Sequence, residues 1–551
     1  MAQHAFAPYR LPPGVLPEEA ARLAADVGAE PLLVPLDEPL PGGLSERSMA
    51  LVPAGSAGQA DEACRSADGS PSVFGGDLRA CLVSERHLTR VSRAAALALE
   101  LGFAGVCLDR PDAPLALGIL GAGFCPDCQR AFSRELAREY GDHFQPIDIL
   151  KLAREALAQS SGALGYEALP FGREFWRMRL GSLERAVQGY ARAARDAARA
   201  HGKPFEVAAL FEAVGPAQLR AARHLDMALY PAQPQQLATG AGMFRLLRTA
   251  MGRRPVAAAI AETGPALARI SAVAAACGVE VVPELPTRPT DPLGAIRRFA
   301  RAQSERRQVH AKAVAECAVL YSSECDAWTA GSHREQVERA GEALAQLHVQ
   351  APVVMRIQDA PPGAVIVLAG ATALSPQEAR EAHRRVDGGG MLLAIGPVGA
   401  VDEAGRKVDA PLPTAKSGGT RLGKGMMSQV PALAPLRPGQ LVDEKQLEPV
   451  SRALSAVLGR RRAAGISGRS PMLVFLEQDG ERLDAHIVAL TSEPAQGMTL
   501  FLSQQYAGNA RRARFQSADG DDQKIVMNPS GTALSTVLPS FSGYAVLSVP
   551  G

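Results

Sequence analysis

The sequence predicts an α/β protein of several domains: a (β/α)8 barrel, a second α/β domain and a C-terminal antiparallel β domain. Two observations support this prediction. Over roughly the first 300 residues, short apolar runs alternate with helical patterns, which is typical of βα units. From residue 471 on, short apolar strands separated by turn signals indicate an antiparallel sandwich. A chain of 551 residues is expected to form about two to four domains.

Composition limits the possible functions and partners. Hydrophobic residues make up 47% and charged residues 21%, which is typical of a globular protein. The net charge of +2 gives no indication of a nucleic-acid or anionic-membrane partner. The first residues lack the basic start and apolar core of a signal peptide, and no apolar run reaches the length of about 18 residues that a membrane helix needs. We therefore expect a cytoplasmic protein.

The barrel strands are predicted from apolar runs. Residues 103–108 are almost wholly apolar without alternation, which indicates a strand buried on both faces of a parallel sheet. We take this run as strand four of an eight-stranded barrel; two earlier strands are predicted at residues 32–36 and 49–52, so the first three strands would occupy unusually little sequence. Later apolar runs predict strands five to eight, at residues 205–211, 225–230, 256–261 and 279–283. Because their spacing is uneven, an open doubly wound sheet is the alternative.

Two long helices flank this region. The first is predicted at residues 85–101 and leads directly into strand four. The second is predicted at residues 171–200, where apolar side chains recur at alternating spacings of three and four. Gly202 and Pro204 end it, because glycine favours the left-handed conformation at a helix end and proline cannot continue a helix.

Carboxylates stand where the predicted strands end. Asp109 ends strand four, Glu212 follows strand five and Glu262 ends strand seven. The carboxyl ends of barrel strands carry the chemistry in α/β barrels, and hydrolysis of a glycosidic bond needs two carboxyl groups. The alternative for Asp109 is that it caps a loop or pairs with Arg110. Taken singly, Glu212 and Glu262 fit a structural role better.

Two further residues are candidates for contact with a substrate. Asp112 follows strand four closely, and Tyr230 closes the strand at residues 225–230. Aromatic residues make up only 5% of the chain. Because sugar-binding clefts commonly stack sugar rings on aromatic side chains, this low content counts against an efficient carbohydrate-cleaving enzyme.

Cys125 and Cys128 are separated by two residues, which is a spacing found in metal sites. Two thiols cannot complete a tetrahedral site. Cys81 or Cys107 could contribute, but nothing in the sequence brings them to the pair. We therefore expect a pair of reduced thiols and no cofactor, with zinc as the less favoured reading. A thioredoxin-like redox role is weaker still, because the pair is predicted to lie in a loop outside a βα context.

The second α/β domain begins near residue 314. Strands are predicted at residues 315–322, 364–370 and 391–396, with helices at 334–347 and 374–386. Gly370 and Ala371 follow the middle strand and offer no nucleophile. The glycines at 388–390 come between a helix and a strand, so they indicate a helix end rather than a phosphate-binding loop. Residues 401–441 are rich in Gly, Pro, Lys and Ser and predict a linker or long loop.

A resemblance to known families rests on three groups of motifs. Residues 104–109, the segment Cys125-Pro-Asp-Cys128 with Phe132, and Tyr140-Gly141 resemble barrel strand four and the following loop of family 42 beta-galactosidases. They are also similar to putative glycosyl hydrolases near the family 29 α-L-fucosidases. Residues 312–410 resemble the trimerisation domain of the beta-galactosidases, which has a class I amidotransferase-like, flavodoxin-type fold. The GYAVL segment near the C-terminus resembles the end of their small β domain.

The resemblance implies roles for these residues. In the fucosidase-like relatives, the residue that matches Asp109 is the nucleophile. The beta-galactosidases instead carry glutamates on strands four and seven, the first preceded by asparagine, and Leu108-Asp109 departs from that pair. The acid/base would then be Glu262 or Glu212. Family 42 enzymes also carry a zinc site of the form C-x-C-x-x-C plus a distant cysteine, and here Gly123 replaces the first member of the triplet.

These observations lead to two hypotheses. The first is a retaining glycoside hydrolase that acts on a carbohydrate through two carboxylates. The second is a catalytically inactive, carbohydrate-binding or scaffold protein on the same fold, which the compressed N-terminal third and the missing Asn-Glu pair favour. The resemblance also implies a homo-oligomer, with a trimer favoured over a dimer and Trp328 near the contact. Domain boundaries are expected at 1–308 (barrel), 309–410 (amidotransferase-like), 411–465 (linker and helix) and 466–551 (β-sandwich).

Overall fold

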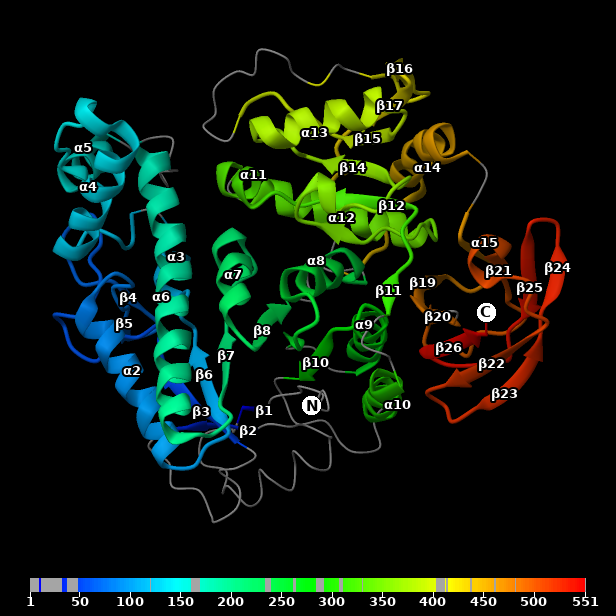
Figure 1. The fold of residues 1–551 in the computed structure, drawn as a ribbon, viewed down its shortest axis with the longest axis horizontal. Coiled ribbons are helices and arrows are strands. Elements are labelled where there is room, and N and C mark those ends of the chain that lie inside the picture. Colours follow the sequence, from blue (N-terminus) through cyan, green and yellow to red (C-terminus); the bar gives the residue numbers. More distant parts are fainter. Residues whose placement is uncertain are drawn as a thin grey trace. The chain divides into compact units, whose positions relative to one another are not determined.

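A computed structural model gives the fold of the chain (Figure 1). It describes residues 9–10, 32–36, 48–118, 120–159, 169–232, 239–260, 264–283, 292–306, 311–329, 331–402, 412, 415–436, 439–459, 462–480 and 482–550. The chain forms two compact units. One holds residues 6–231 with 254–259, and the other holds residues 1–5, 232–253 and 260–551.

The barrel-type sheet has eight strands whose order in space follows their order in the chain. The strands are β1 (Tyr9–Arg10), β2 (Leu32–Pro35), β3 (Ser48–Pro53), β6 (Gly105–Asp109), β7 (Glu206–Leu210), β8 (Met227–Ala232), β9 (Val256–Ile260) and β10 (Glu280–Pro283). Pairing from β1 through β8 is parallel. A doubly wound sheet would reverse its strand order at a switch point, so the sequential order confirms the barrel-like prediction and excludes the alternative.

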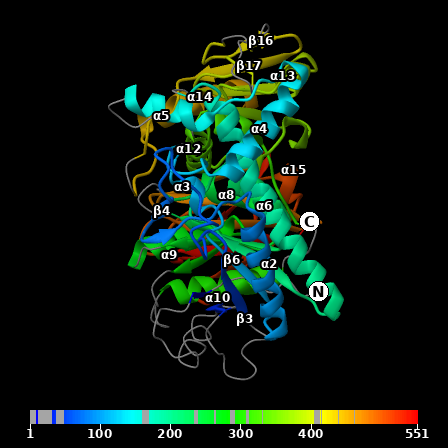
Figure 2. The same cartoon turned by 90° about the vertical axis from the view of Figure 1, so that its left-hand side faces the viewer.

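The two predicted long helices are confirmed as α2 (Glu85–Glu100) and α6 (Gly172–His201), which lie side by side (Figure 2). Gly202 ends α6 in the left-handed conformation, with a φ of 64°. Two large apolar side chains of α2 face outward, since Leu88 and Leu97 are more than a third exposed. His87 turns inward instead and is fully buried.

Short elements and helices complete the barrel-type region. They are β4 (Val73–Phe74), β5 (Asp77–Leu78), α3 (Ala113–Ala116), α4 (Pro126–Tyr140), η2 (Gly141–His143), α5 (Ile149–Gln159), α7 (Pro216–Ala221), η4 (Ala222–His224), α8 (Ala241–Met251), α9 (Gly264–Ala276) and α10 (Pro292–Arg306). Helix α4 starts at Pro126 with Cys125 as its N-cap, so Cys128 lies in its first turn and not in the loop that was predicted for the pair. Phe124 and Phe132 pack around Phe175 of α6. These contacts hold the start of α4 and the loop before it against the long helix.

The second α/β domain contains a six-stranded sheet in the order β13-β12-β14-β15-β17-β16. Its strands are β12 (Cys317–Leu320), β13 (Val353–Val354), β14 (Val365–Ala369), β15 (Met391–Ile395), β16 (Thr420–Leu422) and β17 (Gly425–Val430). Its helical elements are α11 (Ser323–Trp328), α12 (Ser332–Gln346), η6 (Ile357–Asp359), α13 (Pro376–Asp387) and α14 (Glu444–Leu458). All strands but β16 pair in parallel, which gives the strand order of flavodoxin-like folds.

The predicted linker at residues 401–441 is wrong over residues 420–430. These residues form β16 and β17, and β17 adds a parallel strand beside β15. The Gly-rich composition concealed a short buried strand, in which Met427, Ser428 and Val430 are buried whereas Met426 and Gln429 are half-buried. The sheet therefore extends beyond the boundary expected from the sequence.

The C-terminal region is the predicted antiparallel sandwich. One sheet contains β11 (Lys312–Ala313), β19 (Met472–Asp479), β20 (Arg482–Ala489), β26 (Tyr544–Val549), β22 (Arg512–Ser517) and β23 (Asp522–Val526). The other contains β18 (Ala464–Ser467), β21 (Thr499–Ser503), β25 (Ala533–Val537) and β24 (Asn528–Ser530), with α15 (Gln504–Ala507) following β21. Inward-facing apolar residues of both sheets, such as Val474, Leu500 and Phe515, share one core.

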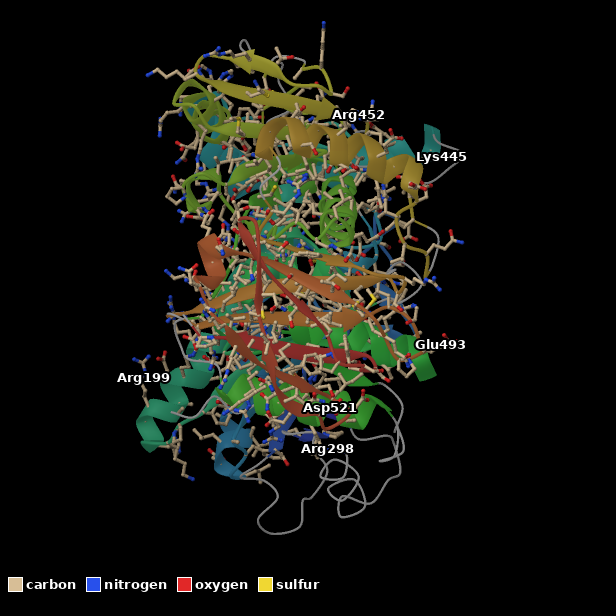
Figure 3. All side chains as sticks on the ribbon, turned by 90° about the vertical axis from the view of Figure 1, so that its right-hand side faces the viewer. Arg199, Arg298, Lys445, Arg452, Glu493 and Asp521 are labelled. Carbon is tan, nitrogen blue, oxygen red and sulfur yellow. The ribbon has the colours of Figure 1, made fainter. Side chains whose placement is uncertain are left out.

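Charged side chains cover the outside of these elements. Arg199, near the end of α6, and Arg452, in the middle of α14, extend into solvent (Figure 3). Exposed pairs such as Arg452 with Glu448 contribute little stability, because water screens them. Within the described parts of the chain, none of the helices combines the length and the apolar character that crossing a bilayer demands.

Two glycines control the packing of α8 against α12. A Cβ added at Gly341 would lie 2.4 Å from the Cα of Gly242, and one added at Gly242 would lie 2.2 Å from the carbonyl oxygen of Glu338. Both helices belong to the same compact unit. Their backbones therefore approach too closely for any side chain at these positions.

We expect Gly341→Ala to lower the free energy of unfolding by about 1–3 kcal/mol, because the added methyl group overpacks a backbone contact. The matched control is Gly181→Ala in α6, where an added Cβ would meet only the end of the Arg185 side chain at 3.2 Å. There the better helix propensity of alanine should raise stability by up to about 1 kcal/mol. Thermal unfolding followed by circular dichroism measures both, and equal shifts for the two variants would refute the close-contact account.

Candidate active site

The structure brings two predicted carboxylates together at the ends of neighbouring strands. Asp109 is the last residue of β6 and lies in register with Pro53 of β3 and Leu210 of β7. Arg110 connects the carboxylates: its Nε lies 3.4 Å from Asp109 Oδ1 and its Nη1 lies 3.5 Å from Glu212 Oε1. Asp109 therefore pairs with Arg110, as the structural alternative from the sequence expected, and it also lies near Glu212. Glu262 lies outside the described residues.

The backbone is constrained at this point. Arg110 has a φ of 46°, in the left-handed region that residues with a side chain seldom adopt. The amide of Gly55 donates a hydrogen bond of 3.1 Å to the carbonyl oxygen of Asp109. A Cβ at Gly55 would lie 1.8 Å from the carbonyl oxygen of Arg110, so only glycine fits there. Strained backbone of this kind is concentrated at functional sites.

Asp112 is buried and holds the segment that carries Glu212. Its carboxylate accepts hydrogen bonds from the amides of Glu212 (2.9 Å) and Ala213 (3.1 Å) and from Nε2 of Gln218 (2.8 Å). Desolvation by burial raises the pKa of Asp112 to about 6. Asp112, which was predicted to contact a substrate, therefore positions the segment that carries Glu212.

Tyr230, the other predicted substrate-binding residue, lies in β8. Its ring is fully buried and stacks on Phe211, with the ring centroids 5.0 Å apart. Its buried hydroxyl has no hydrogen-bond partner within the described part of the chain. Burial raises its pKa, so the phenol stays protonated at neutral pH.

Sequence reasoning missed Arg79, which lies just beyond the β4–β5 hairpin. This arginine is only 1% exposed. Its Nη2 donates to the carbonyl oxygen of Phe74 at 3.1 Å and lies 3.8 Å from Glu212 Oε1. The Phe74 ring covers the guanidinium at 5.2 Å, within cation–π distance. No periodicity marks Arg79 in the sequence, because it belongs to an irregular loop.

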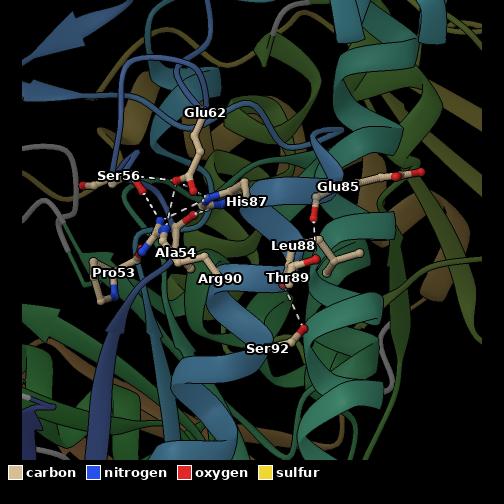
Figure 4. A network of polar contacts seen from close by, with 11 residues as sticks. Pro53, Ala54, Ser56, Glu62, Glu85, His87, Leu88, Thr89, Arg90 and Ser92 are labelled. Carbon is tan, nitrogen blue, oxygen red and sulfur yellow. Dashed lines mark hydrogen bonds and ion pairs between the residues drawn. The ribbon is translucent and has the colours of Figure 1, made fainter.

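A polar network fixes this loop to the start of α2 (Figure 4). Arg90 donates from Nε to Glu62 at 2.9 Å and from Nη2 to the carbonyl oxygen of Ser56 at 2.6 Å. Nε2 of His87 lies 2.9 Å from the carbonyl oxygen of Ala54. Desolvation lowers the pKa of His87 to about 4, so the ring is neutral and donates this bond. The long segment between β3 and α2 is therefore anchored by side chains rather than by regular secondary structure.

Four cysteines meet beside the site. The sulfurs of Cys64, Cys81, Cys125 and Cys128 all lie within 4.8 Å of one another, and all four residues are buried. Cys81 lies 3.2 Å from Cys125 and 3.5 Å from Cys128, and Cys64 lies 4.0 Å from Cys128. The sequence pattern identified only the pair Cys125 and Cys128 as a possible metal site. Cys64 joins from a distant loop, and Cys107 is outside the group.

The donor set fits zinc. A tetrahedral ion with Zn–S bonds of about 2.3 Å places its sulfurs about 3.8 Å apart, close to the observed distances. Gly123 stands where the family motif has its first cysteine, and its amide donates to the sulfur of Cys64 at 2.9 Å. Cys64 thus occupies the space that the missing ligand would fill. The buried guanidinium of Arg179 is close enough to interact electrostatically with Cys64 and Cys128, and it would offset part of the negative charge that four metal-bound thiolates carry.

The raised pKa of Asp112 predicts a pH-dependent stability. Because the folded state holds this proton more tightly than the unfolded state, whose pKa is 3.8, this group destabilises the fold as the pH rises from 4 to 6. The full shift corresponds to about 3 kcal/mol. Since asparagine does not titrate, the unfolding midpoint of Asp112→Asn relative to the native protein should increase from pH 4 to pH 7. A difference that is independent of pH would contradict the assignment.

Comparison with known proteins places the fold. No protein-family model and no curated protein matches the sequence. Among solved structures, the chain is similar to the GH42 beta-galactosidase Gan42B from G. stearothermophilus, with a TM-score of 0.69 and 12% identity over 100% of this chain and 99% of that one. It is also similar to the beta-galactosidase from Halorubrum lacusprofundi, with a TM-score of 0.63 and 15% identity over 100% and 99% of the two chains.

A third similar structure is the alpha-L-fucosidase isoenzyme 2 from Paenibacillus thiaminolyticus. The TM-score is 0.64 at 11% identity, over 99% of each chain. The expected resemblance to both kinds of hydrolase is therefore confirmed at the level of the fold. The chain has a glycoside-hydrolase-like fold over its whole length.

Proposed function

We propose that this protein is a retaining glycoside hydrolase. The observation that carries the proposal is the pair Asp109 and Glu212 at the carboxyl ends of adjacent barrel strands, both within ion-pair distance of Arg110. Two carboxyl groups flanking a bond are what glycosidic cleavage needs. The similar structures named beta-galactosidase and alpha-L-fucosidase support the same reaction class.

In this mechanism Asp109 attacks the anomeric carbon while a protonated Glu212 gives its proton to the leaving oxygen. A glycosyl–enzyme ester results, and the aglycone leaves as an alcohol. Glu212, now ionised, then takes a proton from water, which attacks the same carbon and releases Asp109. Arg110 lies within ion-pair distance of Asp109 and would hold the carboxylate of this nucleophile in place. Glu262 is the alternative acid/base, because it is expected at the end of strand seven.

The alternative is a catalytically inactive, carbohydrate-binding or scaffold protein. The ion pairs of Arg110 favour it, since in the structure both carboxylates already have a positively charged partner. The low aromatic content of 5% points the same way. Turnover that depends on Asp109 separates the two functions.

We expect the protein to hydrolyse at least one 4-nitrophenyl glycoside from a panel that includes the α-L-fucoside and the β-D-galactoside. Asp109→Asn should abolish turnover, and Glu212→Gln should lower kcat by about 10²–10⁴-fold, the range for a general acid/base. The matched control is Glu100→Gln at the exposed end of α2, which should be as active as the native enzyme. Absence of turnover across the panel favours the inactive scaffold. Activity of Asp109→Asn equal to that of the native protein rules out Asp109 as the nucleophile.

We also propose that the four cysteines hold a structural zinc ion. It would be coordinated by Cys64, Cys81, Cys125 and Cys128, which come from three separate segments of the chain. A closed tetrahedral site without an open position contributes to folding rather than to catalysis. The ion would stabilise the loops on either side of the candidate active site.

Elemental analysis of purified protein should therefore find about one zinc per chain, the stoichiometry of a single tetrahedral site. Cys64→Ser should lose most of the metal and unfold at a lower temperature, because three thiolates cannot close the site. Cys277→Ser removes a thiol outside the group and should keep the metal. Zinc retained by Cys64→Ser, or absent from the native protein, would be the contrary result.

We further propose that the second α/β domain, the counterpart of the amidotransferase-like trimerisation domain, joins subunits. Its support is the absence of a nucleophile after β14, where Gly370 and Ala371 stand. Trp328, half-buried at the end of α11, is the candidate contact. Light scattering at micromolar concentration should give a multiple of 57.8 kDa, with a trimer favoured. A monomer mass would refute the assembly.

A further inference from the structure

Arg79 is a buried cation with unused hydrogen-bond donors. Its side chain is 1% exposed, yet the N–H groups on Nε and Nη1 have no acceptor in the parts of the chain that the structure describes. Burying charged donors without acceptors costs several kcal/mol. Because such groups are rare in native proteins, each one calls for a physical explanation.

The neighbouring carboxylates do not supply the missing acceptor. Glu212 Oε1 lies 3.8 Å from Nη2 of Arg79, beyond hydrogen-bond distance, and it is also 3.5 Å from Arg110. Asp112 accepts three other donors, the amides of Glu212 and Ala213 and the side chain of Gln218. Asp109 pairs with Arg110. Arg79 is thus a buried cation whose described carboxylate partner, Glu212, lies within ion-pair distance but beyond hydrogen-bond distance.

We propose that Arg79 binds an anionic substituent of the sugar, a carboxylate or a sulfate ester, so that the substrate is an acidic carbohydrate. This inference rests on the proposed glycoside hydrolase function, because it places the sugar beside Asp109 and Glu212. A planar guanidinium matches the oxygen geometry of carboxylate and sulfate groups and gives short charge-assisted hydrogen bonds. A neutral hydroxyl would accept a single bond and would bring no negative charge to the buried guanidinium.

Phe74 is the cover of this arginine. Its side chain is 50% exposed although the ring lies over the guanidinium. The hairpin turn that follows consists of Gly75 and Gly76, with φ values of 62° and 89° and no atom within 4 Å of an added Cβ. The turn next to Phe74 therefore has open space around it. The anionic group reaches Arg79 when Phe74 turns aside.

The test compares matched substrates that differ only in charge. One arm pairs 4-nitrophenyl β-D-galactoside with the β-D-galacturonide, and a second pairs it with the 6-sulfated galactoside. The ratio of kcat/KM for the charged over the neutral member should be at least about tenfold in the native protein, as expected for charge-assisted hydrogen bonds. Arg79→Met should reduce the ratio to about one. Arg195→Met, which removes an arginine paired with Asp226 on another part of the same unit, should leave the ratio unchanged.

Each outcome decides the proposal. Equal rates for charged and neutral members, or an equal loss on both with Arg79→Met, would overturn it while leaving the hydrolase function intact. If Arg79→Met does not fold, Arg79→Lys keeps the charge but not the planar fork, and an undiminished ratio would be the contradicting result.

If no glycoside is hydrolysed, calorimetry measures the binding of galacturonate, galactose 6-sulfate and galactose instead. If only the acidic sugars bind, and their binding depends on Arg79, the inference is supported although the hydrolase function has failed.

Discussion

The position of β6 between β3 and β7 is the constraint on which the candidate site depends. Parallel pairing places Asp109 opposite Pro53 on one side and opposite Leu210 on the other. Because the carboxyl ends of these strands share one edge, the segments that leave them converge. The loop after β3 brings Arg79, and the turn after β7 brings Glu212. All five β6 residues are buried, so a shift of this register would misplace packed side chains on both faces of the strand.

The loops depend on a second set of contacts. About thirty residues separate β3 from α2, and loops of that length are uncommon unless they are functional. Here the side chains of His87 and Arg90 hold the start of the loop, and Cys64 and Cys81 hold its remainder against α4. Four uncharged thiols attract one another only weakly. A bound zinc would join the three chain segments that carry these cysteines. The joined segments would then support Arg79 and Asp109 rigidly.

Local patterns predicted much of this architecture. The apolar run that became β6, its end at Asp109 and the periodic stripe of α6 are properties of consecutive residues, so the sequence alone was sufficient. The helix start at Pro126 is also a local signal, since proline favours the first helical turn, but the prediction placed both Cys125 and Cys128 in a loop. Strand β17 was missed because a short strand in Gly-rich sequence has no distinctive pattern.

The rest of the site depends on contacts between residues far apart in the chain. Cys64 meets Cys128 across 64 positions, and Glu212 meets Arg110 across 102. No local periodicity predicts these long-range contacts, because they arise from the tertiary packing of irregular loops. This is why the pair Cys125 and Cys128 could be named from spacing, whereas Cys64 and Arg79 became visible only in three dimensions.

The most direct test of the account is to trap the intermediate on Asp109. A 2-deoxy-2-fluoro glycoside of the sugar that the enzyme turns over slows release of the glycosyl group, and mass spectrometry of the digested protein then locates it. The account predicts one sugar per chain, attached to the peptide that contains Asp109, because a retaining mechanism forms an ester with the nucleophile. An adduct on another carboxylate, or turnover of the substrate without any adduct, would contradict it.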